Sequence, residues 1–588
     1  MESFRRKGYA VEALIACILA AARFILPLLA FWLLLRCVRS MLQESYDPEL
    51  WAYLEFPDGT RAQVRHWESV IGRAKSCDIV IPRESVGHTH AALIRSDRGK
   101  WRLYDLGADG GTANGALRDD GDGLALHDGD TLFFADASAV FHPLDDAALL
   151  ENSDRRGMPG QFISQSITLL LLTVFQALLT LEFARSAGQY AASVALSFAA
   201  LALAQWCLYF LMRAMDRRGF EIETLAFFLC TLGMSVTATA APAEIGRQML
   251  LLMAGIVMFL LLGWWLRSLG RTKALRWAAA AAALGLLALN VAFGTSINGA
   301  SNWIRFGGIT LQPSEFVKVA YLYAGASTLD RLYRRRNLFL FIAFSAACVG
   351  ALALMGDFGT ALIFFVTFLI VSFMRSGSFA TVFLAVAGAA LAGLLVLTVK
   401  PYIAQRFAAW GHIWADPYGA GWQQTRALSA AASGGLLGVG AGRGWLRSIF
   451  AADTDMVFCL VSEELGLIIA LCAMLALIAI CIFAVRSAAN GRSSYYVIAA
   501  CAASAMMLVQ LALNVFGSTD LLPFTGVTFP FVSRGGSSLI SCWMLLAFLK
   551  SADTRQNASF SVRLSARRKS AAYDDEPEIE VSGEEAAE

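Results

Sequence analysis

The feature that most constrains this chain is the recurrence of apolar runs long enough to cross a lipid bilayer. Because the hydrocarbon core is about 30 Å thick and an α-helix rises 1.5 Å per residue, about 20 apolar residues suffice for one crossing. Of the 588 residues, 57% are hydrophobic and 16% are charged, and we expect about thirteen membrane helices. They lie near residues 10–38, 162–184, 190–212, 222–240, 246–266, 274–293, 313–328, 338–354, 358–374, 379–399, 457–485, 495–515 and 536–550. The sequence therefore predicts a mainly α-helical polytopic membrane protein.

The first run, 10–38, contains Arg23 and Pro27. It is longer than the core of a signal peptide, and no small-residue cleavage site separates it from the next domain, so we expect a retained membrane helix. An arginine in the bilayer is costly unless it faces protein or reaches the interface. We therefore expect Arg23 to turn toward the other helices.

A change of composition separates the first helix from the others. Between residues 51 and 142, charges and glycines become frequent, and short runs such as "SCDIVI", "WRLYDL" and "TLFFAD" are typical of strands. After residue 552 a basic stretch precedes an acidic one, which is typical of a disordered tail that contacts anionic lipid. The expected parts are a membrane helix (1–45), a small all-β domain (46–145), a linker with two helices (146–220), a ten-helix core (221–552) and the tail (553–588).

The charges of the short loops orient the chain in a membrane. The net charge of +2 gives no reason to expect a nucleic-acid partner. Arg-rich loops alternate with loops that hold few basic residues, and basic loops stay in the cytoplasm. The β domain and the tail are therefore expected in the cytoplasm, and residues 400–455 outside the cell membrane. The Arg-rich loops are 153–157, 213–218, 267–276, 331–336, 374–377 and 486–492.

Polar residues gather in the segments expected outside. Residues 400–455 have no evident secondary structure and exceed the length of a connector, which is typical of a functional loop. Asp416 is the one acidic residue there before Ala452. Glu315 and Lys318 share a face of a helix predicted to start at Pro313, where the simplest interpretation is a structural ion pair. Asp357 either caps the next helix or belongs to a site.

Five segments in this order resemble the SEDS family of FtsW, RodA and SpoVE. They read "NGASNWI…LQPSEFVK", "DFGT", "WADPYGAGWQ…SGGLLGVGAG", "TDMVFCLVSEELGL" and "PFVSRGGSS". The resemblance covers about residues 221–550, the ten-helix core, and leaves about three additional helices before it. It implies a peptidoglycan glycosyltransferase that polymerises lipid II at the outer membrane face, in division, elongation or sporulation. It also implies a class B penicillin-binding transpeptidase as a partner.

The same resemblance places the essential acid of the family on Asp416. We expect this carboxylate to act as general base toward the attacking sugar 4-hydroxyl. No second catalytic acid is needed, in contrast to glycosidases, because a diphosphate leaves without protonation. We expect the glycines of this loop to let the backbone approach the lipid-linked sugar, and Lys318, Arg305 or Arg426 to stabilise the diphosphate. The expected substrate-binding residues are Trp303, Arg305, Gln312, Glu315, Lys318, Asp357, Gln423, Arg426, Ser533, Gly535 and Gly536.

The chain departs from the family pattern at three places, one of which is Arg426, where the loop motif of the family has a second glutamine. "IFAADTDM" (449–456) stands for "LPEAHTDF", and Ser301 and Asn302 replace an arginine before Trp303. These departures leave a catalytically silent scaffold open as an alternative. A transporter of lipid-linked precursors is the other alternative, although it would hold its polar groups near the bilayer midplane. No metal-ligand set is expected, and a divalent-cation requirement stays open.

The β domain resembles a forkhead-associated (FHA) domain. "IGRAKSCDIVI", "GHTHA", "WRLYDLGADGGTANG" and "LHDGDTLFF" follow the strand and loop order of that family. The resemblance implies recognition of a threonine-phosphorylated protein through Arg73, Thr89 and Asn114. Gly87 stands where serine is usual and residues 108–110 replace a polar loop, so a scaffold without ligand contacts is the alternative. For His88 and His90 we expect packing or loop hydrogen bonds rather than metal binding.

Overall fold

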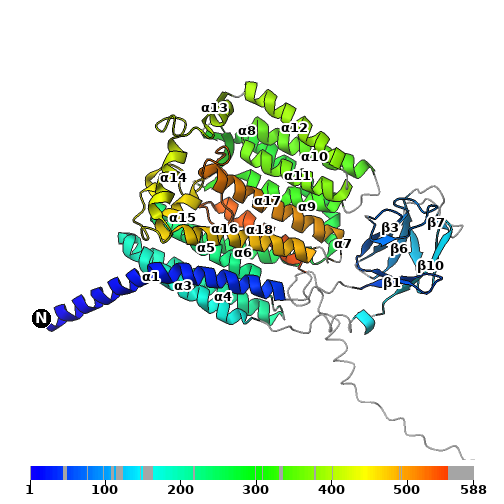
Figure 1. Ribbon diagram of the computed structural model, residues 1–588, viewed down its shortest axis with the longest axis horizontal. Coiled ribbons are helices and arrows are strands. Elements are labelled where there is room, and N and C mark those ends of the chain that lie inside the picture. Colours follow the sequence, from blue (N-terminus) through cyan, green and yellow to red (C-terminus); the bar gives the residue numbers. More distant parts are fainter. Residues whose placement is uncertain are drawn as a thin grey trace, which may run out of the picture.

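The computed structural model shows a helical bundle with a small β-sandwich at one end (Figure 1). The structure describes residues 2–43, 50–75, 77–96, 99–106, 112–113, 123–145, 147–149, 163–215, 217, 219–297, 300–306, 309–329, 335–376, 379–399, 401–488, 491 and 493–553. The predicted tail and the FHA loop with Asn114 lie outside these residues. We call the end of the bundle beside the sandwich the proximal end and the opposite end the distal end.

The long helices follow the apolar runs. Within the described part of the chain, eight are long and apolar enough to span a membrane, and shorter apolar helices lie at 339–354, 358–374, 382–391 and 536–551. The predicted polytopic helical fold is therefore confirmed. The helices are α1 (Glu2–Gln43), α3 (Gln165–Ser186), α4 (Ala191–Ala214), α5 (Glu221–Ala240), α6 (Ile245–Leu266), α8 (Arg276–Phe293), α9 (Pro313–Leu329), α10 (Arg335–Leu354), α11 (Phe358–Ser376), α12 (Phe379–Val399), α16 (Leu467–Ala488), α17 (Ser494–Ser518) and α18 (Gly536–Ser551).

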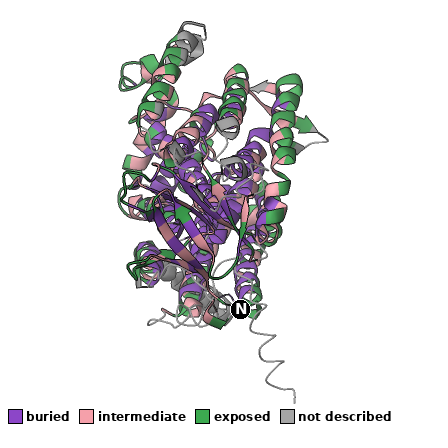
Figure 2. Cartoon of the chain, turned by 90° about the vertical axis from the view of Figure 1, so that its right-hand side faces the viewer, coloured by how far each residue is buried: buried purple, intermediate pink, exposed green. Residues whose placement is uncertain are grey.

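The centre of the bundle is built around α5 and α18. All of the membrane-length window of α5 is buried, and buried residues fill the interior of the molecule in Figure 2. Lys550 of α18 forms an ion pair of 2.9 Å with Glu223 of α5. A fully buried charge is tolerated when it is paired and hydrogen-bonded, and the Lys550 ammonium also donates to the Gly219 carbonyl at 2.7 Å.

The β domain is a sandwich of two five-stranded sheets, ordered β2-β1-β10-β9-β7 and β4-β3-β5-β6-β8. All pairs are antiparallel except β3 with β4. A core that includes Leu54, Leu103 and Phe141 lies between the sheets. The strands are β1 (Ala52–Glu55), β2 (Arg61–Val64), β3 (Glu68–Gly72), β4 (Ile79–Val80), β5 (Ala91–Arg95), β6 (Trp101–Asp105), β7 (Thr112–Ala113), β8 (Leu124–Leu126), β9 (Thr131–Phe134) and β10 (Ala137–Pro143).

The sequence prediction was wrong about two segments. The run 457–485 is not one helix, because Gly466 has φ of +96° and separates α15 (Val457–Leu465) from α16. Residues 401–456 are not free of secondary structure, since they contain α13 (Pro401–Ala409), α14 (Trp422–Gly434) and a 3-10 turn (Leu446–Ser448). Two further features were not predicted from the sequence: α7 (Leu269–Ala274) and a small sheet of β11 (Thr295–Ile297), β12 (Ala300–Phe306) and β13 (Ile309–Leu311).

Candidate functional site

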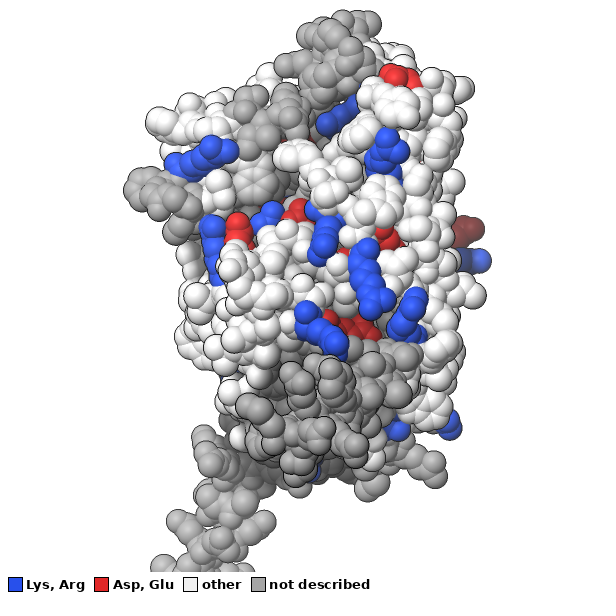
Figure 3. Space-filling model, turned by 90° about the vertical axis from the view of Figure 1, so that its left-hand side faces the viewer, with Lys and Arg blue, Asp and Glu red and all other residues white. Residues whose placement is uncertain are grey.

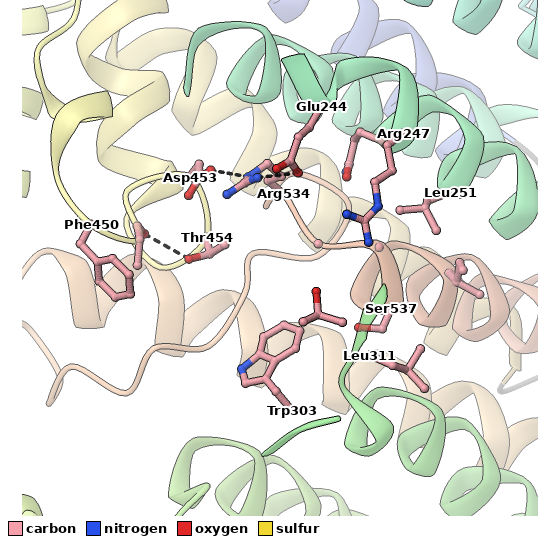
Figure 4. A pocket seen from close by; sticks show the side chains of 16 residues that line it. Glu244, Arg247, Leu251, Trp303, Leu311, Phe450, Asp453, Thr454, Arg534 and Ser537 are labelled. Carbon is pink, nitrogen blue, oxygen red and sulfur yellow. Dashed lines mark hydrogen bonds and ion pairs between the residues drawn. The ribbon is translucent and has the colours of Figure 1, made fainter. Parts of the chain in front are cut away.

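A cavity of about 390 Å³ opens at the distal end of the bundle. Its walls come from four separate parts of the chain: the start of α6, the sheet of β12 and β13, the loop before α15 and the start of α18 (Figure 4). Of the residues predicted to bind substrate, Trp303, Gly535 and Gly536 line it. The full lining is Glu244, Arg247, Gln248, Leu251, Trp303, Thr310, Leu311, Phe450, Ala451, Asp453, Thr454, Arg534, Gly535, Gly536, Ser537 and Ile540.

Arg534 ties three of these walls together. Its Nε atom bonds to Asp453 Oδ2, its Nη1 atom lies 2.9 Å from Glu244 Oε2, and its backbone N–H donates to the Asp453 carbonyl at 2.8 Å (Figure 4). Arg247 is exposed beside this network and has no ion pair among the described residues. The distal face, seen in Figure 3, carries basic side chains interspersed with acidic ones. The cavity is therefore lined by both basic and acidic side chains that a ligand could contact.

The predicted pair on α9 is confirmed. Lys318 Nζ lies 2.7 Å from Glu315 Oε2, and the two side chains are 1% and 4% exposed. Ser541 of α18 donates to the same Glu315 oxygen at 2.6 Å. The pair is buried between α9 and α18 and does not line the cavity, so its membership of the site stays a prediction.

Asp357 caps a helix, which is one of the two interpretations that the sequence left open. Its Oδ1 atom accepts from the Thr360 N–H at 3.1 Å at the start of α11. Its Oδ2 atom accepts from Asn302 Nδ2 at 3.0 Å. Asn302, which stands near the position of the missing arginine, thus links this cap to the strand that carries Trp303.

Asp416 lies in an exposed turn before α14. Its Oδ2 atom accepts from the Ala420 N–H at 3.0 Å, and its carbonyl oxygen accepts from the Gly421 N–H at 3.1 Å. Asp416 does not line the cavity. The turn of Asp416 is connected to the cavity wall through α14. In this helix, Gln423 donates to the carbonyl of Phe450, a cavity residue, at 3.1 Å.

Arg426 is the predicted cation of the same helix. Its guanidinium lies over the rings of Trp422 and Tyr418, 4.3 and 5.7 Å from their centroids. Stacking of this kind leaves the N–H edges of the guanidinium available to an anion. Two aromatic rings thus hold the guanidinium of Arg426 in place on α14, the helix that follows the turn of Asp416.

The glycines at and after the end of α14 have a role that was not predicted from the sequence. A Cβ atom on Gly434 or Gly438 would collide with the carbonyl oxygens of Ser462 and Glu464 in α15. These glycines let the loop pack directly on α15, whereas we expected them to make room for substrate. Two buried carboxylates then hold the loop: Glu463 accepts from the N–H groups of Trp445 and Leu446 at 2.9 and 3.0 Å.

Glu464 and Arg23 hold the same glycine-rich loop from two sides. Glu464 Oε2 accepts from Thr239 Oγ1 at 2.7 Å and from the Gly442 N–H at 3.0 Å. Arg23 donates from Nη2 to the carbonyl of Gly438. The expectation that Arg23 faces protein is confirmed, with the correction that its partner is a distal loop rather than another helix.

The loop before α18 is fixed by Ser533 and Asn514. Ser533 Oγ accepts from the Phe529 N–H at 2.8 Å and donates to the Thr454 carbonyl at 2.6 Å. Asn514 Nδ2 donates to the carbonyls of Asp455 and Val527 at 3.1 and 2.8 Å. Burial raises the pKa of the Asp455 carboxyl to about 6. Ser533 thus positions the cavity loops, and its predicted contact with substrate stays a prediction.

The other predicted residues of this end lie on the small sheet and its exit. Arg305 is exposed on β12, opposite Thr310 of β13. The carbonyl of Gln312 accepts from the Glu315 N–H at 3.2 Å at the start of α9. Neither side chain lines the cavity. The charged cavity residues that were not predicted from the sequence are Glu244, Arg247, Asp453 and Arg534, of which the last two stood inside quoted motifs.

In the β domain, Arg73 follows β3. Its Nη2 and Nη1 atoms contact His88 Nε2 at 3.3 Å and the Glu84 carbonyl at 3.4 Å. Thr89 is exposed nearby. His90 is buried against the ring of Phe134, and its Nδ1 atom accepts from the Gly87 N–H at 3.1 Å.

The expected packing and loop hydrogen bond are confirmed for His90, whereas His88 is exposed and contacts Arg73. Within the described ranges, no group of three or more His, Cys, Asp and Glu side chains is arranged to hold a metal ion.

Residues 222–558 match the family profile of FtsW, RodA and SpoVE, described as a cell cycle protein, and this match spans more than half of the chain. The chain belongs to this family. Residues 69–135 match the FHA domain. Both family resemblances seen in the sequence are therefore confirmed.

Named relatives agree with this assignment. Peptidoglycan glycosyltransferase RodA of Mycobacterium tuberculosis (strain ATCC 25618 / H37Rv) is 33% identical over 323 residues, which are 52% of this chain and 69% of the relative. A probable peptidoglycan glycosyltransferase FtsW of Tolumonas auensis is 36% identical over 281 residues, 45% of this chain and 72% of the relative. These names confirm the enzyme class predicted from the sequence. A chain of a solved peptidoglycan synthase complex is 26% identical and covers 57% of this chain and 97% of its own length, with a TM-score of 0.49.

Proposed function

We propose that this FtsW/RodA/SpoVE family member polymerises lipid II into glycan strands at the outer face of the cytoplasmic membrane. In this proposal the distal end is extracytoplasmic, and the FHA domain and the tail are cytoplasmic, as the Arg-rich loops indicate. The observation that carries it is the distal cavity, whose wall includes Trp303, Gly535 and Gly536 of the family motifs. The turn that bears Asp416 lies at the same end and is joined to that wall through Gln423.

Asp416 acts as the general base. Among the described residues, its Oδ2 atom accepts one hydrogen bond and its Oδ1 atom accepts none, so Oδ1 is available to take a proton. The base removes the proton of the acceptor sugar 4-hydroxyl as that oxygen attacks the anomeric carbon of the donor. The bond from this carbon to the diphosphate breaks, the polyprenyl diphosphate leaves with the electron pair, and the anomeric configuration inverts.

We propose three arginines as the cations that stabilise the leaving diphosphate. Lys318 is 1% exposed and paired with Glu315, so it is poorly placed to meet a ligand. Arg305 and Arg426 are accessible, and Arg247 stands unpaired, among the described residues, at the cavity itself. We assign diphosphate stabilisation to these three arginines, because cations positioned at the leaving group lower the transition-state energy.

A direct assay tests the proposed activity. Purified full-length protein is given labelled lipid II, with and without candidate class B transpeptidases, and the products are separated as glycan ladders on a gel. Ladders made by the wild-type chain are expected. Lipid II left intact with every transpeptidase would support the silent scaffold instead. Accessibility to a membrane-impermeant thiol reagent tests the sidedness, since Asp416→Cys should react from outside and Gln63→Cys should not.

The FHA domain is the proposed reader of a threonine-phosphorylated partner. Arg73 would bind the phosphate by charge-assisted hydrogen bonds, after exchange of its contacts with His88 and the Glu84 carbonyl. Phosphothreonine peptide libraries applied to the full chain should give hits that Arg73→Ala abolishes, while exposed Arg61→Ala keeps them. Hits that survive Arg73→Ala, or none with the wild type, would favour the scaffold interpretation of this domain.

A further inference from the structure

Among the described residues, the short turn between β2 and β3 and the first residue of β3 contact the helical bundle. Residues 65–67 connect β2 with β3, and side chains of this turn and of Glu68, the first residue of β3, contact α7 and the segment at the start of α17. His66 Nδ1 lies 2.6 Å from the Gly491 carbonyl oxygen. The ring of Trp67 packs against the hydrophobic core of the helical bundle. The FHA domain is therefore seated on the membrane part through side chains of its own sandwich.

Glu68 is the polar centre of this contact. Its side chain is 4% exposed, and Oε1 lies 3.2 Å from Lys273 Nζ of α7. The same oxygen accepts from Ser493 Oγ at 3.0 Å, while Oε2 accepts from the Ser494 N–H at 3.0 Å. A buried carboxylate is stable only when its charge and lone pairs are satisfied, and here three donors from the bundle satisfy it.

The contact also completes a helix. Ser493 is the N-cap of α17, and its side chain accepts from the Tyr495 N–H. The N-terminus of a helix carries unsatisfied N–H groups and a partial positive charge, both of which favour a carboxylate. Glu68 of the FHA domain thus supplies the negative charge at the first turn of α17.

At its other end, α17 holds the loops of the distal cavity. Asn514 donates to the carbonyls of Thr454, Asp455 and Val527 at 3.4, 3.1 and 2.8 Å. Thr454 lines the cavity. With 25 residues, α17 joins the two ends of the bundle as one continuous helix.

We propose that Glu68 is a positioning residue through which the FHA domain acts on the distal cavity, with α17 as the connecting element. A domain that served only to recruit partners would need no buried ion pair with the bundle and no part in the cap of α17. Glu68 begins β3, and Arg73, the expected phosphate ligand, follows the last residue of that strand. The strand β3 has five residues. Its first residue contacts α17, and the expected phosphate ligand directly follows its last residue.

Hydrogen–deuterium exchange on the full chain in lipid nanodiscs tests the coupling without reference to activity. Glu68→Gln keeps the size of the side chain but removes its charge and one acceptor. It should raise exchange about tenfold or more at 493–497, and also at 452–456 and 525–528, because breaking a buried pair strands its partners. Lys273→Gln should change the same segments less. Glu55→Gln, which breaks an exposed pair with Arg61 in the same domain, should change none of them.

The activity measurement adds a second readout and rests on the proposed function. Glu68→Gln should lower kcat for lipid II about threefold or more and leave KM nearly unchanged, since substrate contacts stay intact. Exchange that rises only at 493–497, or nowhere, overturns the coupling even if the protein makes glycan. The expected exchange pattern in a chain that makes no glycan would leave the coupling standing and overturn the proposed function.

Discussion

The carboxylates of Asp416 and Glu463 have opposite environments. We call Glu463 and the backbone N–H groups that it binds the loop frame. Asp416 is exposed and its carboxylate accepts a single backbone hydrogen bond. Glu463 is fully buried, and each of its oxygens accepts from a backbone N–H of the glycine-rich loop. A carboxylate that must take a proton needs a free lone pair, whereas one that fixes a loop needs none. We infer that chemistry and positioning are divided between neighbouring parts of the distal loop.

The largest expected effect is at the exposed turn. Asp416→Asn keeps the acceptor for the Ala420 N–H and removes the base, so the rate of polymerisation should fall about 10²- to 10⁴-fold. Thermal unfolding should be unchanged, because the side chain is exposed. The gel assay and a melting curve measure both. Asp520→Asn is the control, since Asp520 is another distal acid that accepts a backbone hydrogen bond, from Gly411. Wild-type rates in Asp416→Asn would place the base elsewhere.

The buried pair of α9 tests whether a positioning role can be separated from a site role. Lys318→Met leaves Glu315 buried and uncompensated, which should cost about 3 to 5 kcal/mol of the free energy of unfolding. The double variant Glu315→Leu/Lys318→Met removes both charges and should recover most of that stability. We expect polymerisation to stay impaired in the double variant, because the pair and its hydrogen bond from Ser541 fix α9 against α18, whose first residues line the cavity. Recovery of activity together with stability would show that the pair is structural alone.

A smaller effect on stability is expected when Glu463 of the loop frame is substituted. Glu463→Gln replaces one acceptor of two buried N–H groups by a donor, and an unsatisfied buried group costs about 1 to 3 kcal/mol. Limited proteolysis should cut the loop 434–446 faster, and polymerisation should fall in parallel with it. The exposed substitution Glu84→Gln should leave both unchanged. A variant of Glu463 that loses activity while its loop keeps full protection would break the proposed division of labour.

The smallest effect concerns Asp455, whose pKa burial raises to about 6. The folded chain binds this proton more tightly than the unfolded chain, so the contribution to stability is present below the ordinary aspartate pKa. It is lost as the pH rises through about 6. Asp455 keeps intermediate exposure to solvent, and solvent screening should limit the change to about 1 kcal/mol. Asp455→Asn should remove this slope from thermal unfolding measured between pH 4 and 8; a wild-type slope in the variant would contradict it.

Local features were predictable from the sequence because they depend on neighbours along the chain. Apolar runs of membrane length gave the positions of the long helices, and Pro313 begins α9 as expected. The i to i+3 spacing of Glu315 and Lys318 was sufficient to predict their ion pair. Alternating short runs and turn residues were sufficient for the β domain, whose family match begins within the predicted boundaries.

Contacts between distant segments were decided by the tertiary structure alone. The cavity joins Glu244, Asp453 and Arg534 from three separate segments, and no periodicity in the sequence reports such a meeting. The glycines of 434–438 were expected to make room for a ligand. They are instead needed because the backbone of α15, which follows later in the chain, packs against them and leaves no space for a side chain. The sequence analysis did not single out Glu68, because its partner, the Ser494 N–H group of α17, lies more than 400 residues later in the chain. Sequence patterns record which face of an element is apolar, whereas the partner of that face depends on the packing of the whole chain.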